Sequence, residues 1–445
     1  MKYLLVILLV LSFILPSNGL ADSTRTLAVA GYIDYSLHTQ FVTSHPEITI
    51  TLSDNYYRDT NRLIDALLTH DATYDVIFIS TQAIDARALI GKGYTYSLTQ
   101  SNILKQSVED MYPDIRQWAE IDNQIYALPI GLTCREMIYR PEFFSDLGLS
   151  VPCSWEDVAA LINSWPEQSD EVRETYNISQ WTYEYRSWFL QNMMGNYVAY
   201  CKACGLKLHF DTPVFRRLMT LADDITNAND VNISDDAAIA AIDDMLSLFE
   251  NGIDPLQNGY RSSRPFPSIA IDGKVYHGVY ITLGIINPYS EHANEAIAYL
   301  EYLAQNVSPQ IRLTLYPNDN TPVENTDFVE AEAQWKAEQA RLNDAIAASS
   351  PENKYELQEE LENYNASWKW IERTRYDVSS EDIAGYTALE DELVYLGPSL
   401  LITVDSSGQM VLKSPQKQYL DGNLTSEQFI NEIENKARMI QLEGE

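Results

Sequence analysis

Basic side chains are scarce in this sequence of 445 residues. It has 30 Lys and Arg against 64 Asp and Glu, which gives a formal net charge of −34 at pH 7. A surface of that sign repels phosphate backbones, so nucleic-acid binding is not expected. The same charge argues more weakly against anionic solutes, because local charge can override the sum.

Residues and motifs for catalysis or metal binding are also few. No nucleophile elbow, H-E-x-x-H, P-loop or G-x-G-x-x-G pattern is present. No two histidines stand four residues apart, as a helical metal site would need. We therefore expect no catalytic residues, no cofactor and no metal. The six histidines are His38, His45, His70, His209, His277 and His292.

Long apolar runs are absent except at the N-terminus. There "MKYLLVILLVLSFILPSNGLADS" has one Lys, an apolar run, a break at Pro16 and a small-x-small sequence at Gly19 and Ala21. The run is short for a membrane span, which needs roughly 20 residues. We predict a signal peptide over residues 1–21 and a mature protein that is soluble in the periplasm or secreted. No cysteine stands directly after the run, so the usual bacterial lipoprotein anchor is missing.

Only four cysteines are present, at Cys134, Cys153, Cys201 and Cys204. An even count in an exported protein permits two disulfides, with three possible pairings. "CKAC" also resembles half of a zinc site or a redox motif, but no second ligand pair stands at zinc-site spacing. We expect a structural disulfide, with free buried thiols as the alternative.

What the first part of the chain does contain is a regular alternation of strands and helices. Residues 26–36 and 74–80 ("YDVIFIS") read as apolar strands, and residues 46–53 alternate with period two. Each strand is followed by a helical segment with one apolar face. This alternation predicts an open α/β sheet.

The carboxyl ends of these strands are the first candidate site, because ligands of open α/β sheets bind there. Two ends carry polar and aromatic side chains, in "GYIDY" and "ISTQ". Their hydroxyl, carboxylate and amide groups can form hydrogen bonds with a ligand. The alternative is that these residues are solvated loop residues that contact no ligand. The candidates are Tyr32, Asp34, Ser80, Thr81 and Gln82.

The chain is too long for one compact core, so a second domain is expected. "QIYALPIGLTCREMIYR", residues 124–140, is one long extended segment, in which Pro129 is tolerated near an edge or a bend. It leads directly into a helix opened by Pro141. Residues 135–262 are mostly helical, and strand character returns at 268–287. A strand that runs directly from one domain into the next is typical of a hinge, so we predict a hinge crossing in this segment.

The spacing of apolar residues over 327–376 predicts an antiparallel helical hairpin with a narrow apolar seam. Its tryptophans are interpreted as seam packing rather than as ligand platforms. Phe328, Trp335 and Leu342 are seven apart, and Leu357, Leu361, Tyr364, Trp368 and Ile371 follow a 4-3-4-3 spacing.

Taken in order, several segments resemble bacterial extracellular solute-binding protein family 1, the ABC-importer group that contains maltose-binding protein. The segments are "FVTSHPEITITL", "YDVIFIS", "QIYALPIGLTCREMIYRPEFFSDLGLSVPCSWEDV", "LHFDTPVFRRLM", "GIINPYSEHANEAIAYLEYL" and "YLDGNLTSEQFINEIENKA". Each is unspecific alone, but all six occur in the family's order. Arg140 departs from the pattern, since the family usually has Asn there.

The resemblance implies an α/β, two-lobed periplasmic-binding-protein-like fold of type II. Crossing hinge strands would join the lobes, and the helical hairpin would be an insertion in the second lobe. Lobe one would span residues 22–131 plus 265–315, and lobe two residues 132–264 plus 316–445.

The function implied is that of a monomeric binding protein, not an enzyme. It would hold a small hydrophilic solute, a sugar or oligosaccharide, in the interlobe cleft and deliver it to ABC permease subunits. Two alternatives stay open at this point. One is an exported enzyme such as a glycosidase, which would use two carboxylates. The other is a sensory binding protein without a transport role.

The resemblance also adds candidate ligand-binding residues. The hinge strand of the family gives a polar side chain to the sugar, and Thr133 aligns with that position. Arg135, two residues on, would share its face in a strand. The alternative for Thr133 is a buried hydroxyl bonded to backbone. From lobe two, Tyr185, Trp188 and Tyr197 would supply ring faces.

Overall fold

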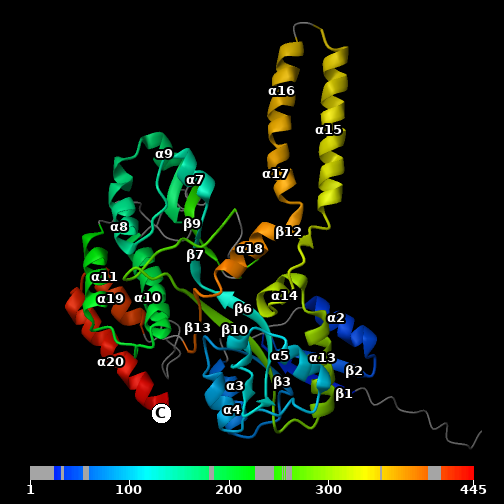
Figure 1. The fold of residues 1–445 in the computed structure, drawn as a ribbon, viewed down its shortest axis with the longest axis vertical. Helices are drawn as coiled ribbons and strands as arrows, with labels where there is room; N and C mark the ends of the chain where they lie inside the picture. The colour runs from blue at the N-terminus through cyan, green and yellow to red at the C-terminus, as the bar shows by residue number, and fades with distance from the viewer. Residues whose placement is uncertain are drawn as a thin grey trace, which may run out of the picture.

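A computed structural model describes most of the chain (Figure 1). The predicted signal peptide, residues 1–21, lies outside the described residues. Within them, none of the helices combines the length and the apolar character that a bilayer crossing requires. The described residues are 25–31, 35–53, 60–179, 185–225, 245–252, 254, 256, 263–350, 353–398 and 412–444.

The larger sheet is built from both early and late segments of the chain. Its order is β13-β10-β3-β1-β2, and β6 pairs with β10. β1 is parallel to β2 and β3, whereas β10 is antiparallel to β3 and β6. The strands are β1 (Arg25–Ala30), β2 (Ile48–Ser53), β3 (Val76–Ser80), β6 (Leu128–Cys134), β10 (His277–Ile286) and β13 (Leu393–Tyr395).

A first hydrophobic core lies around this sheet, and its buried residues come from 27–132 and 281–316. The four apolar residues of β3 are all buried, as expected for a central strand with both faces covered. The three early strands predicted from the sequence are therefore confirmed. The elements of this region are α2 (Tyr35–Ser44), α3 (Thr60–Leu68), α4 (Ala86–Gly91), α5 (Asn102–Glu109), α6 (Pro113–Arg116), β4 (Glu120–Ile121), β5 (Gln124–Ile125), α13 (Ala293–Asn306) and α14 (Pro309–Leu315).

A second core lies around a three-stranded sheet of order β7-β9-β8. Its buried residues come from 137–271 and 412–437. Ile269 and Ile271 belong to it, so the chain returns to the first core later than residue 265. The elements are β7 (Glu136–Tyr139), α7 (Pro141–Asp146), α8 (Trp155–Ser164), η1 (Trp165–Glu167), α9 (Asp170–Thr175), β8 (Tyr176–Ser179), α10 (Tyr185–Ala203), α11 (Pro213–Asp224), β9 (Leu246–Gly252), α19 (Lys413–Leu420) and α20 (Ser426–Gly444).

Three segments cross between the two cores. The first is the step from β6 to β7, the second is β10, and the third includes β13, which pairs with the start of β10. Among the described strands β6 pairs with β10 alone, so Pro129 lies on an edge strand, where its missing N–H is tolerated. The crossing strands predicted between two α/β units are thus confirmed.

The predicted helical hairpin projects away from both cores (Figure 1). It consists of α15 (Phe328–Ala348), α16 (Lys354–Ala366) and α17 (Trp368–Arg373). Inside the seam, the Trp335 ring lies 4.7 Å from that of Trp368 and 5.6 Å from that of Tyr364. The interpretation of these rings as seam packing is confirmed.

The base of the hairpin is a short ribbon that lies beside α14 and α18 (Ser380–Ala388). In it β11 (Val323–Glu324) pairs antiparallel with β12 (Tyr376–Val378). The Tyr386 hydroxyl on α18 donates to the Thr314 carbonyl at 3.4 Å.

The expected disulfide is not formed. All four cysteines are free thiols. Cys134 and Cys201 are buried, which makes the alternative reading correct for those two. Cys153 instead donates to the Asp157 carboxylate at 3.2 Å. At the start of α8, the Ser154 hydroxyl accepts from the Asp157 amide at 3.1 Å, which caps the helix.

Candidate ligand-binding site

The parallel strands β1, β2 and β3 place their carboxyl ends at one edge of the larger sheet. Ser80, Thr81 and Gln82 stand at that edge, after β3. The predicted residues Tyr32 and Asp34 follow β1 and lie outside the described residues. The structure therefore places three of the five residues of the first predicted site directly.

Five residues form a row across the strands at this edge, and we name them the crossing strip. They are Ser80, Gly131, Thr133, Tyr280 and Thr282. Thr282 of β10 pairs with Ser80 on one side and with Gly131 on the other. Tyr280 pairs with Thr133. Directly paired residues share a face, and so do residues two apart on one strand. The crossing strip is thus one continuous surface on β6, β10 and the end of β3.

The crossing strip is partly open and carries no charge. All its residues except Tyr280 are half-buried. A Cβ placed on Gly131 would meet no atom of the described residues within 4 Å. The Ser80 hydroxyl accepts from the Gln82 amide at 3.2 Å. The hydroxyls of Thr133 and Thr282 make no hydrogen bond to the described part of the chain, so each can donate to and accept from a ligand.

Thr81, also predicted as a ligand-binding residue, belongs to the buried framework. Its side chain is fully buried, whereas that of Ser80 is half-buried. The hydroxyl accepts from the Ile281 amide at 3.0 Å. Gln82, the next residue, is also buried, with 7% of its surface exposed.

Arg135 does not share a strand face with Thr133. β6 ends at Cys134 and β7 begins at Glu136, so Arg135 is the break between them. Its side chain is exposed. The two-residue alternation on which its prediction rested therefore stops one residue earlier.

The aromatic residues predicted from the second lobe are core residues. Tyr185, Trp188 and Tyr197 are 1%, 4% and 1% exposed. Trp188 packs against Phe249 at 5.5 Å between ring centroids. The Tyr185 hydroxyl donates to Asn177 Oδ1 at 2.5 Å, and that of Tyr197 donates to the His209 carbonyl at 2.6 Å. Their rings are already covered by protein.

Sequence reasoning missed Thr282, Tyr280 and Gly131. Thr282 is the one residue of β10 that is not buried. A polar residue inside the apolar run "GVYITLGII" was the available signal, but only the pairing with Ser80 shows where it stands.

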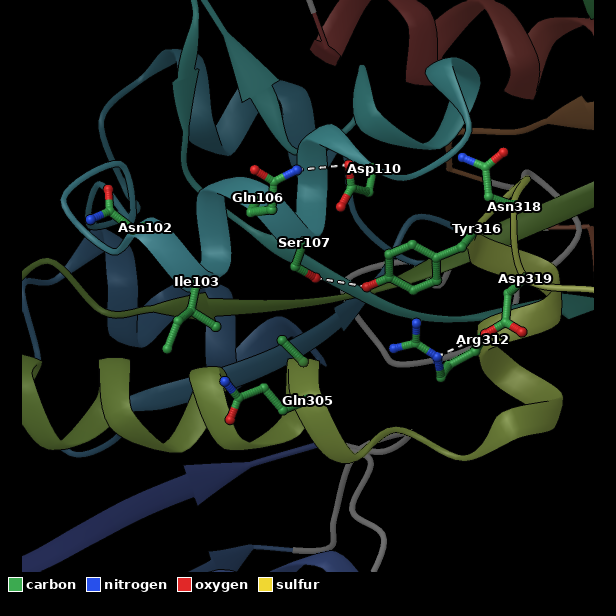
Figure 2. A pocket seen from close by; sticks show the side chains of 11 residues that line it. Asn102, Ile103, Gln106, Ser107, Asp110, Gln305, Arg312, Tyr316, Asn318 and Asp319 are labelled. Atoms are coloured by element: carbon green, nitrogen blue, oxygen red, sulfur yellow. Dashed lines mark hydrogen bonds and ion pairs between the residues drawn. The ribbon is translucent and has the colours of Figure 1, made fainter.

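A groove of about 800 Å³ lies elsewhere on the first lobe, between α5 and the region from α13 to Asp319 (Figure 2). Much of its polar lining is already paired. Ser107 bonds Tyr316 at 2.7 Å, and Arg312 pairs with Asp319 at 2.9 Å. The remaining lining is mostly surface carboxamides, so we assign it no ligand.

No protein-family model matches the sequence, and no curated protein matches it. Solved structures do resemble the fold. An ABC substrate-binding protein from Listeria monocytogenes, in complex with cycloalternan, is 12% identical, with 94% of this chain and 98% of that chain covered and a TM-score of 0.54. An ABC transporter solute-binding protein from Agrobacterium vitis S4, with bound D-mannitol, is 13% identical, with 94% and 98% covered and a TM-score of 0.55.

The GacH receptor of Streptomyces glaucescens, solved unliganded and with acarbose, gives similar values. It is 12% identical, with 94% of this chain and 98% of that chain covered and a TM-score of 0.55. Across nearly the whole chain, the protein therefore has the two-lobed periplasmic-binding-protein-like fold, and the predicted fold class is confirmed.

Proposed function

We propose that this chain is an extracytoplasmic solute-binding protein that captures a small hydrophilic solute between its lobes and delivers it to an ABC importer. One observation carries the proposal: two separate cores are joined by three crossing segments, and two of these segments, with the end of β3, bear a partly open, uncharged polar strip. A ligand on the strip that also contacts the second lobe would shift the equilibrium toward a closed form.

A sugar or oligosaccharide is the solute class that suits the crossing strip. The hydroxyls of Ser80, Thr133 and Thr282 are donors and acceptors without charge, as neutral polyols require. The strongly negative chain disfavours anionic solutes. Proteins of similar fold were solved with cycloalternan, D-mannitol and acarbose.

The proposed ligand-binding residues are those of the strip together with the predicted residues Tyr32, Asp34 and Gln82. Arg135, exposed at the break between β6 and β7, stays a candidate for the rim. The proposed division into lobes follows the predicted one, except that the chain returns to lobe one at β10 rather than at residue 265. We further propose that the protein acts as a monomer after removal of residues 1–21 and that its closed form docks on permease subunits.

A thermal-shift screen tests this proposal, because a ligand present at 100 times its Kd adds about 2.7 kcal/mol of stability. The screen would compare neutral sugars and oligosaccharides with polyamines and peptides. Small-angle scattering with and without the best solute then tests closure. Stabilisation by peptides or polyamines alone would contradict the sugar class, and hydrolysis of a glycoside would indicate an enzyme.

A further inference from the structure

The end of α10 brings two thiols and a lysine together. Cys201 lies in the last turn of the helix and is 3% exposed, and Cys204 directly follows the helix and is half-buried. The Lys274 ammonium lies 3.8 Å from the Cys204 sulfur. None of these three residues belongs to the crossing strip, so the cluster is separate from the proposed solute site.

A tight turn sets the backbone position of Lys274. Ile271 and Lys274 exchange two backbone hydrogen bonds, at 2.9 and 3.1 Å. Asp272 and Gly273, the two residues between them, both have positive φ, at 51° and 73°. Two central residues with positive φ are typical of a type I′ turn, which is a well-defined conformation. Lys274 therefore starts from a fixed point of the backbone.

This turn is also attached to the helices of the second lobe. The Asp272 carboxylate accepts from the Arg217 guanidinium of α11 at 2.8 Å. It accepts from the Tyr200 hydroxyl of α10 at 3.4 Å. Tyr200 lies in the same last turn of α10 as Cys201. The turn that bears Lys274 is thus held against the helix end that bears the thiols.

The spacing of the two cysteines suits a disulfide. Residues three apart lie on one face of a helix, with Cα atoms about 5 Å apart in ideal geometry. A disulfide usually joins Cα atoms about 4.4 to 6.8 Å apart. The helix ends directly at the pair, since Gly205 has a φ of 64° and the Leu206 amide donates to the Cys201 carbonyl at 2.8 Å. A last turn can tighten toward 3₁₀ geometry, in which side chains three apart are eclipsed, so the sulfurs can meet.

The two thiols of the pair differ in reactivity. The thiolate is the nucleophile of a cysteine, and a neighbouring cation favours it. Cys204 has such a cation in Lys274 and is accessible to solvent. Burial raises the pKa of the Cys201 thiol, which keeps it protonated. Cys204 is therefore the thiol that reacts first, and Cys201 is the thiol that reacts second.

Cys153 provides the contrast within the same chain. It is more exposed than Cys204. Its thiol donates to the Asp157 carboxylate at 3.2 Å, and this hydrogen bond raises the pKa of the thiol. Exposure alone would make Cys153 the most reactive cysteine, whereas the neighbouring charges favour Cys204.

We propose that Cys201, Cys204 and Lys274 form a redox site that exchanges with small disulfides of the glutathione type. The free thiols of this structure are its reduced state. The proposal goes beyond the proposed function and does not depend on it, because no residue of the solute site takes part.

The exchange has two steps. The Cys204 thiolate attacks one sulfur of the small disulfide, forms a mixed disulfide and releases one small thiol. Cys201 then loses its proton to solvent, and its sulfur attacks the Cys204 sulfur and releases the second small thiol. The two cysteines are oxidised to one disulfide, the small disulfide is reduced to two thiols, and the two cysteine protons end on those thiols.

The experiment uses the whole chain with Cys153→Ser, so that the exposed thiol outside the cluster cannot react, and glutathione disulfide as the probe. Intact mass of the folded protein should show the loss of two hydrogen atoms, and peptide mapping should join Cys201 to Cys204. Cys201→Ala removes the second thiol and should retain one glutathione on Cys204. Cys204→Ala should retain none, because the remaining thiol of the pair is buried.

Lys274→Gln tests the ammonium and leaves both thiols in place. Alkylation of Cys204 by iodoacetamide should slow by roughly 3- to 10-fold near neutral pH, because less of the thiol is ionised. Lys202→Gln removes the same charge from an exposed position between the two cysteines in the sequence and should have a smaller effect. Equal effects of the two lysine variants would overturn the role of Lys274.

The chain without the Cys201 substitution decides the order of reaction if Cys201→Ala does not fold. In the native protein, iodoacetamide should then label Cys204 before Cys201. Three results would overturn the proposal. They are no oxidation of the folded protein, a glutathione retained on Cys204 while Cys201 stays reduced, and labelling of Cys201 ahead of Cys204.

Discussion

Thr81 and Ile281 hold each other through two hydrogen bonds. The Thr81 amide donates to the Ile281 carbonyl at 2.9 Å, and the Ile281 amide donates to the Thr81 hydroxyl at 3.0 Å. Thr81 follows β3, and Ile281 lies in the strand that passes between the cores. The pair therefore fastens the carboxyl end of β3, where the candidate site lies, to the hinge.

Replacing Thr81 should lower stability more than its size suggests. Thr81→Val keeps the volume but leaves the buried Ile281 amide without an acceptor, which costs about 1 to 3 kcal/mol. Thr81→Ser keeps the hydroxyl and should cost less. Urea unfolding at equilibrium measures both free energies of unfolding. Equal losses in the two variants would show that the hydroxyl bond does not matter.

The crossing strip should determine solute affinity. Thr133→Val and Thr282→Val each remove an available hydroxyl and should weaken binding by roughly 10- to 100-fold, if its partner on the solute is left unpaired. Thr387→Val, on the exposed surface of α18, is the matched control. Calorimetric titration with the solute found by the screen provides the values. Unchanged affinity in both strip variants would remove the strip from the site.

Trp188 should matter for stability rather than for ligand contact. Trp188→Ala leaves a large void against Phe249 in the second core, with an expected cost of about 3 to 5 kcal/mol. Trp188→Phe should lose less. Chemical unfolding reports the cost, and titration under conditions where the variant is folded reports affinity. A stable variant with weakened binding would restore the original prediction of a ring face at the ligand.

The helical hairpin should open without disturbing the sheets. Its seam is made by its own rings, so Trp335→Ala removes the contacts to Trp368 and Tyr364 and leaves both cores intact. Hydrogen exchange should increase across residues 328–373 and stay unchanged in β3 and β10. Faster exchange in those strands to the same extent would mean that the hairpin supports the body of the protein.

What could be predicted from the sequence was local. The continuous apolar run of β3 and the heptad spacing of Phe328 and Trp335 each depend on neighbours within one element. The buried position of Trp188 fits the broad buried face of α10, which also includes Phe189, Leu190 and Met193.

The distinction between Ser80 and Thr81 could not be read in this way. It depends on pairing with a strand 200 residues later in the chain, which turns one hydroxyl to the crossing strip and the other to the Ile281 amide. The end of β6 at Cys134 could not be predicted either. It is the point at which the chain stops pairing with β10 and continues as β7, which pairs with β9. Neither relationship has a signal in the sequence around it.

The interleaving of the two cores sets an order of assembly during synthesis. The last buried residue of the first core is Tyr316, whereas the second core needs residues up to Ala437. A chain elongating from its N-terminus can complete the first core while α19 and α20 have not yet been made, and domains generally fold as units in that direction. The second core must then close around a segment already held at both ends by a folded neighbour. A chain that stops before Lys413 should therefore leave one finished lobe attached to one that cannot close.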